Sequence, residues 1–452
     1  MSFDLVIDNG TVVAPGAEPA PLAVGVRDGK IAAIGAHGTL TGGKDVVDAK
    51  GLHVFPGLVD PHIHVGFINK VDTDFESESA SAATGGVCTV IPFYRHVAGD
   101  NPARAVDSGT VGTDNNYAES FPFIKAAGEN HSHVDFSLHY AFTTEGHLSN
   151  LDSFLDLGVG SFKFYLAYKD DEAATYKFIG EGPNDGLLLD AMKAFGERGN
   201  VVACIHAENP EIYKRATKRV KESGRSDLHA WEESRPAICE AENVSRCYYF
   251  GEITGAPVYI VHMSSREALA VTRRAKLYNK KAYAETCPHY LTHNVDSELG
   301  GMLRVTPPVR TKDDNEALWA AVADGTIDTV GSDHTYRSRA IKQGNVWEAA
   351  SAFPGTATIL PVLLSEGHRK RGLSLTRIAE VTSKNPATIF GLGDRKGDIK
   401  VGLDADFAIV DLNWARTVEA AMLNSAADFS IYEGWTLTGW PRHTIVRGTR
   451  VM

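Results

Sequence analysis

The chain has 452 residues, of which 43% are hydrophobic and 23% are charged. These values are ordinary for a globular protein, and they exclude a disordered tail, a collagen-like fibre and a coiled coil. The 57 acidic residues outnumber the 45 lysines and arginines, which leaves a formal net charge of −12. Because such a chain repels phosphate backbones, we expect no nucleic-acid partner.

Three features of the sequence bear on its location. No apolar run approaches the roughly 18 residues that a membrane helix needs. The first residues, MSFDLVIDNG, carry acids where a signal peptide has a basic segment followed by an apolar one. The 5 cysteines make neither a disulfide framework nor a zinc ribbon. We therefore expect a cytoplasmic protein that does not interact with membranes.

Both ends of the chain have the pattern of short strands and turns. Apolar and polar residues alternate in DLVIDNGTVVA, LAVGVRDGKIAAIG and KDVVDAKGLHVFP, which predicts hairpins, the second of them around Asp28-Gly29. The same alternation of apolar and polar residues occurs near the C-terminus, in GDIKVGLDADFAIVDL and HTIVRGTRVM. We predict a small β-sandwich domain formed by residues 1–56 together with 397–452, with the middle of the chain inserted into it.

Residues 57–396 have a different pattern, in which eight short apolar segments alternate with stretches of helix length. The segments are FPGLVDPHIHV, GGVCTVIPF, HVDFSLHYAF, GVGSFKFYLA, NVVACIHAE, PVYIVHMS, KAYAETCPHY and IDTVGSDH. Between them, LLLDAMKAFGERG and ENVSRCYYFGEI have helical spacing, whereas ESFPFIKAAGENHS has no clear assignment. Eight strand–helix units over about 280 residues predict an α/β fold, a (β/α)₈ TIM barrel.

Five of the eight segments end in a residue that can bind a metal ion. These residues are His62, His64, Lys163, His206, His262 and Asp333. Active sites of such barrels lie at the carboxyl ends of the strands, so we expect these side chains to gather there. His62 and His64 are two residues apart on a strand and therefore leave the same face, an arrangement that suits zinc.

Each of these residues also has a simpler interpretation when it is taken alone. A single histidine such as His206 fits a hydrogen-bonded core residue, and an HxH pair is a weak motif. Asp333 in GSDH is equally suited to cap a following helix. Lys163 is unusual, because a lysine within an apolar strand costs free energy unless it is neutralised or paired. The occurrence of all of them at the same end of successive strands favours a metal site.

The strings GLVDPHIH, GVGSFKFYLAY, HAEN, VHMSS, ETCPHYL and GSDH resemble the amidohydrolase superfamily. The resemblance is strongest to its cyclic amidohydrolases, which are dihydropyrimidinases, hydantoinases, allantoinases and dihydroorotases. It extends over nearly the whole chain, including TSKNPATIFGLGDRKGDIKVGLDADFAIVD. It implies metal-dependent hydrolysis of a hydantoin- or dihydropyrimidine-like cyclic amide. The alternatives are an allantoinase, another C–N hydrolase of the superfamily, and a non-catalytic assembly protein.

The resemblance also implies roles for individual residues. His62, His64 and Asp333 would hold one divalent ion, and His206 and His262 a second. Lys163, N-carboxylated by carbon dioxide, would bridge the two ions, for which we expect zinc, with manganese or iron as alternatives. Asp333 would act as general base and then acid, and Tyr168 would stabilise the oxyanion unless it is a packing aromatic. Relatives form homo-oligomers, so we expect a dimer or tetramer.

Three departures from the family patterns concern the substrate. Dihydroorotases follow the HxH pair with an arginine, whereas this chain has Val65-Gly66-Phe67 there, so a carboxylated ring is disfavoured. Thr306 stands where many hydantoinases have serine. The Asn-Gly-x-Pro-Gly pattern of hydantoinases appears as SAFPG, without its asparagine. The residues that we expect to contact the substrate are Tyr168, Thr306, Ser351 and Phe353, with Phe67, Phe93 and Tyr94 as further aromatic candidates.

Overall fold

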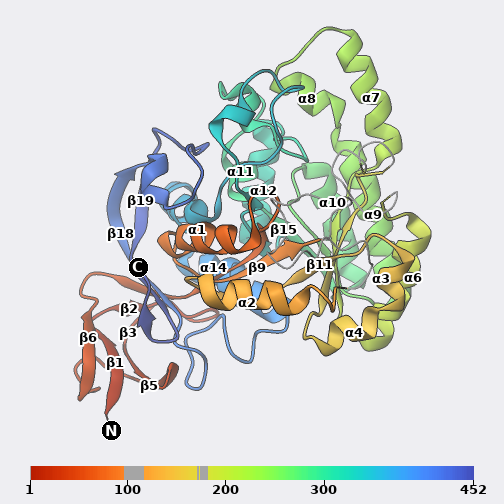
Figure 1. The fold of residues 1–452 in the computed structure, drawn as a ribbon. Coiled ribbons are helices and arrows are strands. Elements are labelled where there is room, and N and C mark those ends of the chain that lie inside the picture. Colours follow the sequence, from red (N-terminus) through yellow and green to blue (C-terminus); the bar gives the residue numbers. More distant parts are fainter. Residues whose placement is uncertain (1, 96–116, 170–172, 174–181) are drawn as a thin grey trace.

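The structure is a computed structural model, and it describes residues 2–95, 117–169, 173 and 182–452. Its centre is a sheet of parallel strands surrounded by helices, and two further sheets lie at one end of the molecule (Figure 1). Within the described ranges, we find no helix that is long and apolar enough to cross a membrane.

The central sheet has the strand order β16-β15-β14-β13-β12-β11-β9-β8-β17, and all its pairings are parallel. Its strands are β8 (Leu58–His64), β9 (Val87–Tyr94), β11 (His139–Ala141), β12 (Ser161–Tyr165), β13 (Val202–His206), β14 (Val258–Ile260), β15 (Ala282–Thr286), β16 (Thr329–Val330) and β17 (His334–Thr335), with β10 (Asp135–Phe136) beside β9. The two ends of this order, β16 and β17, are separated by only three residues, so the sheet closes on itself. All eight predicted segments contribute to it, and the predicted TIM barrel is confirmed.

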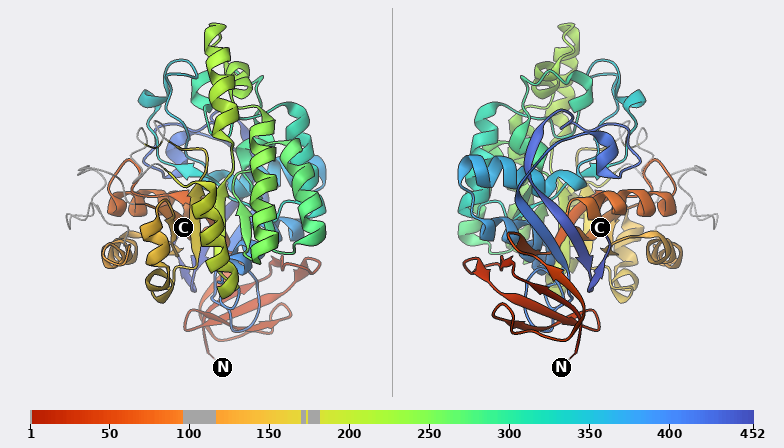
Figure 2. Two further views of the ribbon diagram at one scale, coloured as in Figure 1. Left: turned by 90° about the vertical axis from the view of Figure 1, so that its right-hand side faces the viewer. Right: turned by 90° about the vertical axis from the view of Figure 1, so that its left-hand side faces the viewer.

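Helices cover the outside of the barrel. They are α1 (Val71–Thr84), α2 (Phe121–His131), α3 (Glu145–Ser149), α4 (Leu151–Asp156), α6 (Asp185–Arg198), α9 (Ala237–Thr254), α10 (Arg266–Tyr278), α11 (Pro288–Thr292), α12 (Lys312–Asp324), α13 (Ile359–Val362), α14 (Leu375–Ala379) and α15 (Asn385–Ile389). Both predicted helices are present, as α6 and α9, and the unassigned segment ESFPFIKAAGENHS forms α2. The Asn184 side chain caps the start of α6, and Gly199, at φ 80°, ends it. Two more helices, α7 (Pro210–Glu222) and α8 (Leu228–Ser234), lie at the end of the molecule opposite the N-terminus (Figure 2).

The two remaining sheets form the predicted sandwich. One has the order β5-β4-β1-β6 and consists of β1 (Phe3–Asp8), β4 (Ala23–Arg27), β5 (Lys30–Gly35) and β6 (Gly43–Asp48). The other has the order β20-β19-β18-β7-β2-β3 and consists of β2 (Thr11–Val12), β3 (Ala20–Pro21), β7 (His53–Pro56), β18 (Phe407–Thr417), β19 (Thr436–Val446) and β20 (Thr449–Arg450). Here β7 pairs antiparallel with β18, which joins the N-terminal to the C-terminal segment. Buried side chains such as Val24, Ile31 and Phe407 form the core between the two sheets.

One of the three predicted hairpins is confirmed, and two are wrong. Strands β4 and β5 pair through the turn at Asp28-Gly29, where both residues have positive φ. In contrast, β1 and β2 belong to different sheets, as do β6 and β7. Asn9, at φ 62°, turns the chain between β1 and β2, and Gly10 passes so close to Ala49 that a Cβ on it would lie 2.8 Å from the alanine Cβ. An alternating apolar pattern indicates that one face of a strand is buried, but it does not indicate which strand is the partner. Strands of both sheets of a sandwich show the pattern, because both sheets bury one face in the same core.

Candidate metal centre and active site

The six predicted ligands lie at or near the carboxyl ends of the barrel strands. They are His62 and His64 on β8, Lys163 on β12, His206 on β13, His262 after β14, and Asp333 between β16 and β17. Because the strands are parallel, these ends meet at one rim of the barrel. All but one line a single cavity of about 580 Å³, and the exception, His62, is fully buried beside it.

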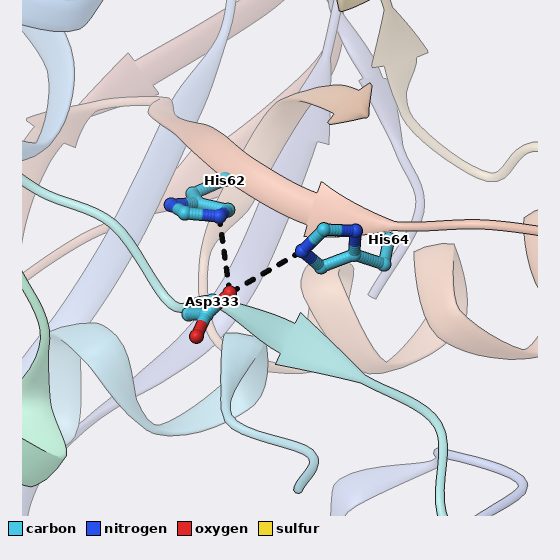
Figure 3. A group of neighbouring side chains, drawn as sticks. All are labelled: His62, His64 and Asp333. Carbon is cyan, nitrogen blue, oxygen red and sulfur yellow. Dashed lines mark ion pairs between the residues drawn. The ribbon is translucent and has the colours of Figure 1, made fainter. Parts of the chain in front are cut away.

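His62, His64 and Asp333 form the tightest cluster. Oδ1 of Asp333 lies 3.0 Å from Nε2 of His62 and 3.3 Å from Nε2 of His64, and its other oxygen points away from both rings (Figure 3). One ligand atom from each residue lies within 4.8 Å of the others. Two atoms that bind a tetrahedral zinc ion at about 2.0–2.1 Å lie about 3.3 Å apart, so this spacing fits a shared cation.

Lys163, His206 and His262 extend the cluster. The rings of His206 and His262 have centroids 4.5 Å apart, and the His262 ring stacks on that of His62 at 5.4 Å. Nζ of Lys163 lies 3.3 Å from Nε2 of His62. Nδ1 of His262 is buried without a hydrogen-bond partner among the described residues, which is uncommon for a buried polar atom. These imidazoles and the carboxylate are donors that divalent cations of the zinc type prefer.

Buried carboxylates hold two of the histidines in place. Glu285 accepts hydrogen bonds from Nδ1 of His62 at 2.6 Å and from the backbone N–H of His262 at 2.8 Å. Glu208 lies 2.7 Å from Nε2 of His206 and also pairs with Arg235 at 3.2 Å. Such partners fix the tautomer and the orientation of a metal-binding imidazole. We assigned no role to Glu285 or Glu208 from the sequence, although both lie in the quoted strings ETCPHYL and HAEN, where an acid at a buried strand end was a usable signal.

Burial largely determines the charge states at the site. It lowers the pKa of His64 to about 4 and holds the pKa of His262 well below its usual value. Burial also favours neutral His62, but the carboxylates of Glu285 and Asp333 together outweigh it and raise the pKa of His62. For Asp333, burial acts to raise the pKa, and the neighbouring His62 and His64 lower it well below its usual value. The site therefore presents mostly neutral imidazoles and an ionised carboxylate, the forms that bind metals.

Two of these residues have an uncommon backbone conformation. The φ angles are 42° at His262 and 51° at Asp333, in the left-handed region that residues other than glycine rarely adopt. Such strain persists where the surrounding structure enforces it, and it often marks functional sites. The buried Asp60 carboxylate contributes here, because it accepts hydrogen bonds from Ser332 at 2.5 Å and Thr356 at 2.8 Å. Strand β17 follows Asp333 directly, so the alternative that Asp333 caps a helix is wrong.

Three of the four predicted substrate residues line the cavity, namely Tyr168, Thr306 and Ser351. The Tyr168 ring lies 5.2 Å from that of His206, and the hydroxyl oxygens of Thr306 and Ser351 are 3.3 Å apart. Phe353 lies behind the wall, where it is 2% exposed and packs edge-on against His289. It is not among the described residues that line the cavity, so the expected direct contact with the substrate is wrong. The residues of that segment at the surface of the cavity are Ser351 and Ala352.

The remaining aromatic candidates differ in whether they reach the cavity, and two arginines also line it. Phe67 lines the cavity, whereas Phe93 packs against the edge of His62 at 4.7 Å and Tyr94 is buried. The sequence interpretation missed Arg95 and Arg337, which also line the cavity. Arg95 directly follows β9, so its position at a strand end was a usable signal. Arg337 lies in the loop after β17, where no spacing rule applies.

Comparison with known proteins identifies the family of this chain. The model of the Amidohydrolase family matches residues 169–451. An L-hydantoinase of Paenarthrobacter aurescens is 31% identical, over 99% of this chain and 94% of its own. An allantoinase of Solibacter usitatus is 32% identical, over 99% of this chain and 93% of its own. The solved structure of an L-hydantoinase (dihydropyrimidinase) from Arthrobacter aurescens is 30% identical and has a TM-score of 0.88, covering 99% of this chain and 96% of that one. This chain therefore belongs to the amidohydrolase family.

Proposed function

We propose that the protein is a metal-dependent hydrolase that opens a cyclic amide or imide of the hydantoin or dihydropyrimidine type. The observation that carries this proposal is the gathering of four imidazoles, Lys163 and Asp333 at one cavity whose wall includes Tyr168. The names of the relatives, hydantoinase and allantoinase, support a cyclic amide as the substrate.

The ligand assignment divides the residues between two divalent cations. His62, His64 and Asp333 would hold one, and His206 and His262 the other. Lys163 would lie between them as a carbamate, formed when its neutral amine bonds to the carbon of carbon dioxide and loses a proton. Zinc suits this donor set, and manganese or iron are the alternatives. When bound, such a pair polarises a carbonyl oxygen and lowers the pKa of water toward neutrality.

Two side chains of this wall would act on the substrate directly. Asp333 uses Oδ1 toward the two histidines, which leaves its outward oxygen to take the proton of the attacking water and pass it to the leaving ring nitrogen. The Tyr168 hydroxyl would donate a hydrogen bond to the oxygen that becomes negative during attack. Thr306 and Ser351 would contact the ring, and Phe353 would support their segment from behind.

The proposal also includes the organisation of the protein. The sandwich comprises residues 1–56 and 397–452, and the barrel residues 57–396. We propose a homo-oligomer, a dimer or tetramer, by analogy with relatives of the superfamily. Cytoplasmic location fits the five cysteines, which are all buried and free of disulfides.

Metal analysis and a substrate panel test the proposal together. We expect about two metal ions per chain, loss of activity on chelation, and its return with zinc or manganese. The panel contains hydantoin, 5-phenylhydantoin, dihydrouracil, allantoin, succinimide and dihydroorotate, each followed by the loss of ring absorbance. Preference for allantoin would establish the allantoinase alternative. A protein without metal that opens none of these rings would contradict the enzyme and favour a non-catalytic assembly role.

A further inference from the structure

Two arginines line the cavity beside the proposed metal ligands. Arg95 directly follows β9, and Arg337 lies two residues after β17. Strands β9 and β17 are the neighbours of β8, one on each side, and β8 carries His62 and His64. The arginines therefore reach the same cavity from both flanks of the first barrel strand.

Phe67 brings the two guanidinium groups to one part of the wall. Its ring centre lies 5.1 Å from the guanidinium carbon of Arg95 and 5.1 Å from that of Arg337. The same ring lies 6.0 Å from the ring of His64. A cation near an aromatic face is electrostatically favoured, so Phe67 holds both charges near the metal ligands.

Backbone carbonyls orient Arg337. Its Nε donates a hydrogen bond to the carbonyl of Ser351 at 2.9 Å, and its Nη1 donates one to the carbonyl of Tyr336 at 2.9 Å. The residue is only 6% exposed. Since Ser351 also lines the cavity, these bonds fix the guanidinium relative to the segment that we expect to contact the substrate.

The described wall carries guanidinium groups outside the proposed set of metal ligands. These are the groups of Arg95 and Arg337, whereas Lys163 is a proposed metal ligand and the acidic Asp333 faces His62 and His64. A planar guanidinium presents paired N–H donors that match the two oxygens of a carboxylate. The absence of an arginine after His64 disfavoured a carboxylated ring, but the fold supplies guanidinium groups from two other strand ends.

We propose that Arg95 and Arg337 bind a carboxylate attached to the ring of the substrate, so that the preferred substrates are cyclic amides with an anionic substituent. This inference rests on the proposed function, and it narrows the substrate class by charge. It adds to the cavity an anion subsite, next to Phe67, that is separate from the proposed metal ligands.

A pair of rings that differ only in charge tests the inference. The holoenzyme is assayed on 5-carboxymethylhydantoin and on its neutral carboxamide, and we expect kcat/KM at least tenfold higher for the carboxylate. Arg95→Gln and Arg337→Gln should each lower kcat/KM for the carboxylate about 10- to 100-fold and change the neutral ring less than about threefold. Arg337→Lys, which keeps the charge without the paired donors, should lie between.

Arg304 offers a matched control. It lies on the same side of the barrel, because its carbonyl accepts the backbone N–H of Ala352, but its guanidinium packs on Trp231 at 4.6 Å and is not among the described lining residues. Arg304→Gln should leave the preference for the carboxylate unchanged. An equal loss in this variant would show that charge at a distance, rather than contact, sets the preference, and would overturn the inference.

Binding of the ring-opened products separates this inference from the proposed function. Calorimetry should give at least tenfold tighter binding of N-carbamoylaspartate than of N-carbamoylasparagine, with the difference lost in both arginine variants. If the rings are opened without regard to charge, or the variants affect both rings equally, the anion subsite is refuted and the hydrolase stands. If no ring is opened but the arginine-dependent binding is found, the hydrolase is refuted and the subsite stands.

Discussion

Lys163 and Lys396 are both buried, but their surroundings differ in kind. Lys163, on β12, is 1% exposed, and its Nζ lies 3.3 Å from a ring nitrogen of His62 and 4.3 Å from the centre of the Phe93 ring. Nζ of Lys396 lies 2.6 Å from Asp406, 2.7 Å from Asp135 and 3.4 Å from Asp404. One ammonium group thus faces rings, and the other faces three carboxylates.

Their pKa values diverge accordingly. Burial lowers the pKa of Lys163 to about 8, and Asp333 opposes this shift only in part. Burial acts in the same direction on Lys396, but Asp406 and Asp135 outweigh it and raise the pKa above its usual value. The contrast shows that the neighbouring charges, rather than burial itself, separate a lysine suited to chemistry from one suited to structure.

The surroundings of Lys396 also have a structural meaning. Asp135 belongs to β10, beside the barrel, whereas Asp404 and Asp406 lead into β18 of the sandwich. The three carboxylates are close enough to hold a metal ion, yet the Lys396 ammonium group already lies among them. Lys396 therefore joins the barrel to the sandwich.

Replacing Lys163 should have the largest effect. We expect Lys163→Ala to reduce the metal content from about two ions per chain to one or none, and kcat by roughly a thousandfold or more, because the ligand that we propose both ions share is lost. Elemental analysis and steady-state kinetics measure both. Lys396→Met, in its folded fraction, should keep its metal ions. Full metal loading of Lys163→Ala would remove the bridging assignment.

Replacing Lys396 should affect stability instead. Lys396→Met leaves the buried carboxylate of Asp406 without its cation, so we expect the free energy of unfolding to fall by about 3 kcal/mol. The loss is limited because Asp135 still pairs with Arg447, and Asp404 with Lys30 and Arg395. Lys163→Met, compared with wild type after both are stripped of metal, should change it by less than about 1 kcal/mol, since no carboxylate pair is broken. Urea titrations provide the comparison. Equal losses in the two variants would mean that the two sites do not differ as described.

Tyr168→Phe tests the chemistry beside Lys163 without removing a ligand. We expect kcat to fall about a hundredfold, because one hydrogen-bond donor to the developing negative charge is lost, while the metal content stays the same. Tyr165→Phe removes a hydroxyl from the same cavity wall and should cost less than about threefold. A similar loss in both variants would assign Tyr168 to packing.

The smallest effect concerns alkaline pH. Because the pKa of Lys396 is raised on folding, its stabilisation is complete below the unfolded lysine pKa of about 10.4 and is lost as the pH rises through the folded value. The difference in unfolding free energy between wild type and Lys396→Met should stay constant from about pH 7 to 9 and then shrink by up to about 1.4 kcal/mol per pH unit. Urea midpoints across this range measure it, and a difference that grows above pH 10 would contradict the raised pKa.

The barrel and the positions of its candidate ligands were predictable because both depend on local sequence. Each of these residues ends or closely follows an apolar segment. Parallel strands bring such ends together regardless of the length and sequence of the loops between them. Which side chains from distant segments pair with one another was not predictable in this way. Glu285 reaches His62 across 223 residues, and Arg337 reaches the cavity through a loop.

Two expectations were wrong, each for its own reason. The hairpins failed because alternation reports burial and not which strand is the partner, and the two sheets of the sandwich share one core. Phe353 was expected at the substrate from its place in a motif, but in the fold its ring packs against His289, and Ser351 and Ala352 of that motif form the cavity surface.

The barrel closes where β17, only two residues long, pairs with β8, and Asp333 stands directly before that seam. A cation shared by Asp333 with His62 and His64 would act as a cross-link between the first and last strands. Resistance to heat should then rise with the concentration of free metal, since binding confined to the closed form stabilises it by mass action. Amide exchange along β8 and β17 should slow in parallel.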